Sequence, residues 1–119
     1  MAIVDLTTGK AVKIPVGIGP AQVFIQSDDR YAFVVNQGTE QSPSQTISKV
    51  DLTTKQVVAT ITTGKGAHGV VTSQDNRFVY VTNMYEDTVS VIDNQQNKVV
   101  STVSVGKTPN GITIVEPKQ

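Results

Sequence analysis

The sequence predicts an all-β protein that is built from repeated units, and three observations carry this prediction. Valine and threonine dominate the 119 residues, whereas leucine occurs only at Leu6 and Leu52. Such β-branched composition favours strands over helices. No window places apolar residues at i, i+3, i+4 and i+7 over three turns, as an amphipathic helix requires. Finally, the stretch RYAFVVN at 30–36 returns as RFVYVTN at 77–83.

The repeat has a basic unit of about 42 residues. An aspartate that ends an apolar stretch occurs at Asp5, Asp51 and Asp93, in steps of 46 and 42 residues. The longer step is explained by a five-residue insertion within NQGTEQSPSQT. A one-residue deletion offsets it, because the stretch from Asp5 to Gly17 is one residue shorter than the stretch from Asp51 to Gly64. A fixed period of 20–50 residues is typical of repeat folds. The predicted units are about 1–20, 21–66, 67–108 and 109–119, within a single domain over 1–119.

Turn residues divide each complete unit into four short strands. In the third unit these are expected at 69–73, 77–83, 88–93 and 98–105, separated by QDN, MYED and NQQN. The repeating aspartate ends the third strand, where its carboxylate can accept backbone N–H groups in an Asx-turn. Four strands per 40–45 residues are typical of a β-propeller blade.

The predicted ring is incomplete. The chain starts in the third strand of a blade at 3–6, contains two full blades, and ends after one first strand at 111–115. Propellers close with four to eight blades, so these roughly 2.75 blades are not expected to close a ring alone. Open blade faces expose apolar surface of the kind found at interfaces. We therefore expect either the remainder of a longer propeller or self-association of copies head to tail.

The residues at 73–112 carry a family resemblance. This stretch resembles the YVTN β-propeller repeat family, named for the tetrapeptide that stands here at 80–83, and FVVN at 33–36 is a weaker match. The resemblance covers essentially the whole chain and implies the propeller fold. It also implies an extracytoplasmic, surface-layer-like setting (periplasmic, secreted or cell-surface), although MAIVDLTTGK at the start predicts no signal peptide. Such propellers are similar to ones that bind haem or act as lactonases.

Composition argues against several classes of function. Ten basic and ten acidic residues give a net charge of zero, which disfavours a nucleic-acid binder and a polybasic membrane anchor. No apolar run approaches the ~18 residues of a spanning helix, so membrane insertion is not expected. Because the chain has no cysteine, disulfides, thiolate catalysis and cysteine-based zinc sites are excluded.

Candidate binding residues lie on the connections at the mouth of the central channel, between the second and third strands and between successive blades. His68 is the only histidine, and the aligned positions hold Ala21 and Asn110. It is a candidate metal or haem ligand, although the chain offers it no partner ligands; the alternative is a loop histidine bonded to backbone or water. Lys65 and Lys107 align as a basic pair. The predicted rim consists of His68, Lys65, Lys107, Asn110, Asn83 and Tyr85, the last as a possible interface anchor.

No catalytic residues are predicted. GKT at 106–108 lacks the upstream glycine and the helix of a phosphate-binding loop. A Ser-His-Asp triad would need a nucleophile elbow, GxSxG, which is missing. The acidic pairs at 28–29 and 86–87 can serve acid–base chemistry or calcium, or can simply be solvated turns.

The sequence therefore favours a non-catalytic propeller module that acts as a scaffold or an interaction surface for a protein partner, with no cofactor. The alternative is a piece of a larger propeller that binds a metal or haem, or that is a lactonase-like or oxidoreductase-like enzyme. These two hypotheses differ over His68. Similarity of fold alone does not separate them.

Overall fold

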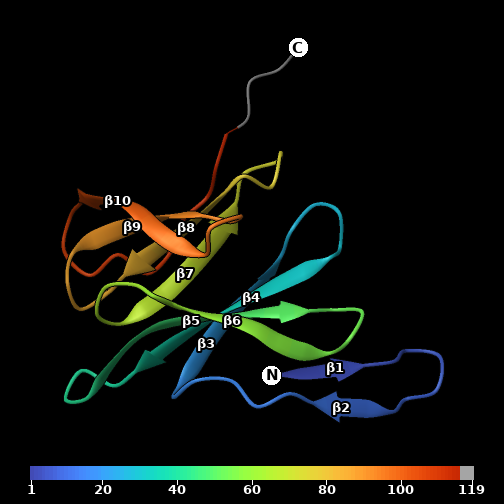
Figure 1. Cartoon of the computed structure of the whole chain (residues 1–119). Helices are drawn as coiled ribbons and strands as arrows, with labels where there is room; N and C mark the ends of the chain where they lie inside the picture. The colour runs from blue at the N-terminus through green and yellow to red at the C-terminus, as the bar shows by residue number, and fades with distance from the viewer. Residues whose placement is uncertain (116–119) are drawn as a thin grey trace.

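The structure is a computed structural model that describes residues 1–115, and the end of the fourth predicted unit, residues 116–119, lies outside this part. The described residues form strands and turns, which confirms the all-β prediction (Figure 1). They include no helix that could span a membrane. The strands are β1 (Ala2–Val4), β2 (Ala11–Lys13), β3 (Pro20–Ile25), β4 (Tyr31–Gly38), β5 (Pro43–Asp51), β6 (Gln56–Thr62), β7 (Ala67–Thr72), β8 (Phe78–Asn83), β9 (Thr88–Asp93) and β10 (Lys98–Ser104).

Two four-stranded antiparallel sheets follow one another along the chain. Strands β3, β4, β5 and β6 pair in that order to form blade I, and β7, β8, β9 and β10 pair in that order to form blade II. Strands β1 and β2 form a separate hairpin beside blade I (Figure 1). Each sheet is a meander of neighbouring strands, as in a propeller blade, and the described residues do not close a ring.

The predicted turns after the third strand of each unit are confirmed. The Oδ1 atom of Asp51 accepts hydrogen bonds from the backbone N–H groups of Thr53 and Thr54, at 2.8 and 3.0 Å. Asp5 and Asp93 accept the same pair of bonds in their own units. Each carboxylate thus satisfies two backbone donors of the turn, and the third strand ends at the same place in every unit.

The two end strands correct the prediction. The expected strand at 3–6 is shorter, because Asp5 already opens the turn and Leu6 is 94% exposed. The expected strand at 111–115 is not a strand in the structure, so the prediction of an eleventh strand there is wrong. A β-strand needs a hydrogen-bonded neighbour. The second strand of that blade would have to supply it, and the described residues contain none.

The main core lies between the two blades. Strands β4, β5 and β6 of blade I meet β7, β8 and β9 of blade II there, and Phe33 and Ile47 are fully buried at the centre. The other face of blade I packs through Val34 and Val50 on the N-terminal hairpin and the segment behind it. Blade I is therefore covered on both faces, whereas within residues 1–115 no sheet lies on the far face of blade II. The main core comprises Phe33, Val35, Ile47, Ile61, Ala67, Val70, Val79, Val81 and Ile92.

Candidate functional site

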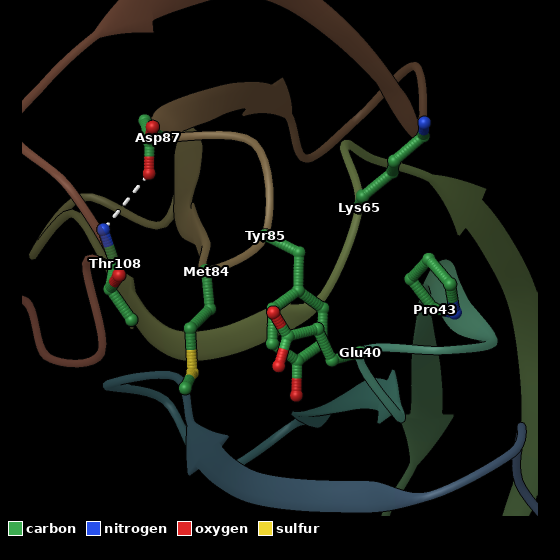
Figure 2. Close-up of a pocket in the computed structure, with 7 residues that line it drawn as sticks. All are labelled: Glu40, Pro43, Lys65, Met84, Tyr85, Asp87 and Thr108. Atoms are coloured by element: carbon green, nitrogen blue, oxygen red, sulfur yellow. Dashed lines mark hydrogen bonds between the residues drawn. The ribbon is translucent and has the colours of Figure 1, made fainter.

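A cleft of about 590 Å³ opens on the mouth face of the two blades (Figure 2). Its walls come from the β4–β5 connection, the β6–β7 connection between the blades, the β8–β9 turn, and the segment after β10. The sequence predicted that these connections share one face, and the cleft brings them together. We call it the mouth cleft, and it is lined by Glu40, Pro43, Lys65, Met84, Tyr85, Asp87 and Thr108.

Backbone hydrogen bonds fix the walls of the mouth cleft. The N–H of Gly66 donates to the carbonyl oxygen of Ser44 at 2.8 Å, which joins the β6–β7 connection to the inserted loop. The N–H groups of Met84 and Tyr85 donate to the carbonyl oxygens of Gly66 and Lys65, at 2.9 and 3.1 Å. Three connections are thereby tied to one another, so the cleft is already formed without a ligand.

Tyr85 lines the mouth cleft, and two contacts hold its side chain in place. Its ring packs against Gly66, whose φ of 73° lies in the left-handed region and whose missing side chain leaves room for the ring. Its hydroxyl oxygen accepts a hydrogen bond from Nε2 of Gln37 at 2.7 Å. Figure 2 shows Met84 next to it on the same turn, with its side chain extending in the same direction. Together they form an apolar surface between charged residues.

The mouth cleft carries more acidic than basic groups. Its lining contains two carboxylates, Glu40 and Asp87, and one cation, Lys65. Oδ1 of Asp87 accepts a hydrogen bond from the N–H of Thr108 at 2.9 Å (Figure 2), which holds the segment after β10 in place. This contact leaves the second carboxylate oxygen of Asp87 without a hydrogen bond among the described residues. The charge balance favours a ligand that brings positive charge.

His68 and Asn110 lie together at the start of β7, but they do not line the mouth cleft. Nδ1 of His68 is 2.8 Å from the carbonyl oxygen of Asn110, so in the neutral ring Nδ1 is the donor and Nε2 is the acceptor. Nε2 of Gln22 is 3.3 Å from the same ring nitrogen. His68 thus joins the innermost strand of blade II to the next connection. Lys107 is exposed on that connection, outside the cleft lining.

Asn83 is fully buried beneath the rim, which corrects its expected place at the surface. Its Nδ2 donates to Oγ1 of Thr88 at 3.0 Å and to Oγ of Ser90 at 2.9 Å. Its Oδ1 accepts from the N–H of Gly64 at 3.0 Å. The amide therefore joins the incoming connection to β8 and β9, and all of its hydrogen-bonding groups are used inside the protein.

Asn36 repeats this arrangement in blade I. Its Nδ2 donates to Oγ1 of Thr46 and to Oγ of Ser48, both at 3.1 Å. Its Oδ1, however, is buried without a hydrogen-bond partner. The asparagine that ends the repeated tetrapeptide is thus a structural residue, and the internal hydrogen bonds account for its recurrence in both blades.

The acidic pairs lie on turns. Glu86 accepts a hydrogen bond from Oγ1 of Thr88 at 3.2 Å, and Asp28 lies on the opposite face of the blades. The side-chain amide of Gln26 and the backbone N–H of Arg30 both donate to Asp28, and these hydrogen bonds lower the pKa of its carboxyl group. Within residues 1–115, no three histidine, cysteine or acidic side chains gather in a way that could hold a metal ion.

Sequence patterns did not single out three of the residues that line the mouth cleft, Glu40, Pro43 and Met84. Glu40 and Pro43 come from the insertion, and Met84 directly follows the repeated tetrapeptide. The available signal was their position: an insertion in one unit lies opposite the corresponding turn of the next unit. A loop that is longer than its counterpart in the neighbouring repeat is a common place for a binding site.

A family model described as a YNCE-like β-propeller matches residues 3–118. The chain belongs to the YNCE-like β-propeller family. This membership agrees with the two four-stranded blades and confirms that they are propeller blades. A comparison with curated proteins gave no match.

Solved structures show the same architecture. The chain superposes on hydrazine synthase from Kuenenia stuttgartiensis with a TM-score of 0.73 and 27% identity, covering 78% of this chain and 25% of that one. It superposes on the dihydro-heme d1 dehydrogenase NirN in complex with DHE with a TM-score of 0.76 and 20% identity, covering 92% of this chain and 24% of that one. It superposes on apo AztD from Citrobacter koseri with a TM-score of 0.71 and 15% identity, covering 92% of this chain and 30% of that one. The chain thus spans about a quarter to a third of the length of these structures.

Proposed function

We propose that this YNCE-like propeller chain is a non-catalytic binding module whose mouth cleft receives an extended segment of a protein partner. One observation carries the proposal. The walls of the cleft come from connections in successive units, and backbone hydrogen bonds already hold those connections together. A preformed surface costs little ordering free energy when a ligand binds, which is what a recognition site requires.

The lining residues define the chemistry of the partner. Met84 and Tyr85 offer an apolar contact of the kind that dominates interface energetics. Glu40 and Asp87 flank it with negative charge. We therefore expect a partner segment with one large apolar side chain next to lysine or arginine. Lys65 contributes by pairing with a carboxylate or a carbonyl oxygen of the same segment.

The side chain contacts support a role without catalysis. His68 is the only histidine in the chain, and its contacts are the carbonyl oxygen of Asn110 and the amide of Gln22. Nucleophilic catalysis needs a hydroxyl or thiol within hydrogen-bond reach of such a base. Neither contact of His68 is of this kind, and the mouth cleft itself contains no histidine.

A peptide-display library panned against the full chain tests the proposal. We expect enrichment of peptides that combine an apolar residue with adjacent basic residues. In Met84→Ala, affinity for a synthetic copy of an enriched peptide should fall about tenfold, because the variant removes the apolar anchor without changing the charge of the cleft. Thr54→Ala, on the opposite face, is the matched control and should bind as the wild type does. Panning without enrichment, or equal binding by Met84→Ala, would contradict the proposal.

We also propose that the repeats are of the YVTN type and that the far face of blade II packs on a further blade, supplied by a longer propeller or by a second copy. Tyr80–Asn83 and the internal bonds of Asn83 support the first statement. Val103 on β10, which is 49% exposed where the aligned Ile61 of blade I is 2% exposed, supports the second. Light scattering on the chain should detect self-association that Val103→Lys weakens. A wild type that stays monomeric at high concentration would exclude the second copy.

A further inference from the structure

A second cleft, of about 350 Å³, lies on the face opposite the mouth, between the turns of the two blades. We call it the turn cleft. Blade I contributes Arg30 and Lys49, and blade II contributes Asn76 and Asn97 from its two turns on this face. Its lining contains two cations, one tyrosine and four side-chain amides, and no acidic residue. It is thus separate from the mouth cleft in place and opposite to it in charge.

Lys49 is a buried cation without an acidic partner. It is 6% exposed, and its Nζ donates to the carbonyl oxygen of Asn94 at 2.8 Å and to Oδ1 of Asn97 at 2.9 Å. Nζ also lies 4.4 Å from the centre of the Tyr31 ring. In the described part of the chain, no carboxylate oxygen lies within 4.0 Å of this nitrogen. A charge held away from water is costly unless it is paired, and an ammonium has a third N–H to offer.

Two side-chain amides of the turn cleft, those of Asn76 and Asn97, also have donors to spare, whereas Asn94 has a buried Oδ1 acceptor without a hydrogen bond. Oδ1 of Asn97 accepts from Lys49, and Oδ1 of Asn76 accepts from the N–H and the hydroxyl of Ser27. These bonds fix the orientation of both amides, so that each Nδ2 is a donor, and neither Nδ2 has a hydrogen bond in residues 1–115. The Arg30 guanidinium lies 5.1 Å from the centre of the Tyr31 ring and has no ion pair there. Donors therefore converge on the turn cleft from both blades, and the acceptors beside Lys49, the carbonyl oxygen of Asn94 and Oδ1 of Asn97, are already engaged by it.

We propose that the turn cleft binds a small oxyanion, such as inorganic phosphate or a carboxylate, held by Arg30, Lys49, Asn76 and Asn97. An oxyanion supplies acceptors for the donors that remain free, and charge-assisted hydrogen bonds to arginine and lysine are the strongest that side chains make. Because the ligand would contact both blades, its binding would also hold the two sheets together. Burial and the charge of Arg30 lower the pKa of Lys49, and a bound anion would raise that pKa again.

The repeat provides a built-in comparison. Arg77 stands in blade II where Arg30 stands in blade I, and it too lies over an aromatic ring, 5.3 Å from the centre of Phe78. The position that aligns with Lys49 is Val91, so blade II has no cation at the equivalent position. Comparing variants at Arg30 and at Arg77 therefore distinguishes a specific anion site from a general attraction of anions to arginine.

Titration of the full chain with inorganic phosphate, at constant ionic strength maintained with chloride, tests the proposal by NMR. We expect saturable amide shifts confined to residues 30–31, 49, 76 and 94–97. Arg30→Gln should weaken phosphate binding about tenfold, because it removes one charge-assisted contact while its side chain is exposed. Arg77→Gln should leave the affinity unchanged.

A second variant tests the anion site while the protein stays folded. Asn97→Asp keeps an acceptor for Lys49 but places a carboxylate in the turn cleft, so it should abolish the phosphate-dependent shifts while the folded spectrum remains. Acetate in place of phosphate tests a single carboxylate, and a peptide ending in glutamate tests whether the anion can belong to a polypeptide. Shifts that do not saturate, that spread over all lysines and arginines, or that weaken equally in Arg77→Gln would overturn the proposal.

Discussion

Blades I and II share strand order and turn chemistry, but aligned residues in the two blades differ widely in burial. Ile61 on β6 is 2% exposed, whereas Val103, its counterpart on β10, is 49% exposed. Phe33 is fully buried, and its counterpart Tyr80 is only half-buried. In the part of the chain that the structure describes, blade I has neighbours on both faces and blade II on one. In this fold a residue is buried by the adjacent unit rather than by its own sheet, so stability is a sum over interfaces.

The largest predicted effect is the difference in stability between variants of two aligned aromatic residues. Phe33→Ala removes a fully buried ring from the interface between the blades and should lower the free energy of unfolding by about 4 kcal/mol. Tyr80→Ala, on the uncovered face of blade II, should cost about 1 kcal/mol. Urea unfolding of both variants measures the difference. Equal losses would mean that the far face of blade II is covered in solution.

The next effect concerns the two structural asparagines. Asn83→Ala removes three hydrogen bonds, including the one from Gly64, and should cost about 2 kcal/mol. Asn36→Ala should cost about 1 kcal/mol less, since its Oδ1 has no partner to lose. Hydrogen exchange at the Gly64 amide should accelerate in Asn83→Ala alone. If Asn36→Ala proves the more costly of the two, the comparison fails.

The smallest effect distinguishes Lys49 from the aligned Val91. Burial and the nearby charge of Arg30 lower the pKa of Lys49 below its ordinary 10.5. Between the folded pKa and 10.5 the unfolded chain binds more protons, so the stability of the wild type rises with pH in this window. Lys49→Met should lack that rise and differ from the wild type by no more than about 1 kcal/mol at pH 7. Unfolding free energies from pH 7 upward measure both slopes, and parallel slopes would contradict the burial of a charged lysine.

Local patterns in the sequence predicted most of the fold. The strand expected at 88–93 is β9, residue for residue, because turn residues bracket it on both sides. The aspartates of the turns behave as expected because an Asx-turn involves only the next three residues. The segment at 111–115 has the same apolar character, but strand formation depends on a paired neighbour, which strand propensity cannot supply.

The binding surfaces were less predictable, because they depend on contacts between units. The mouth face followed from the alternation of connections, but the inward direction of Asn83 depends on the connection that passes over it. The turn cleft left one trace in the sequence. Where blade II has Val91, blade I has Lys49, a cation at a position that the repeat makes apolar. Aligning the units residue by residue would have identified it.

The bond between Gly64 and Asn83 has a consequence for synthesis on the ribosome. It spans 19 residues, and the same asparagine also needs Ser90 on the following strand. In a nascent chain, the side chain of Asn83 therefore completes these hydrogen bonds, which fix the connection into blade II, only after β9 has emerged from the ribosome. During a translation pause just after residue 64, the strands of blade I would therefore be complete while the connection to blade II lacked its hydrogen-bond partner.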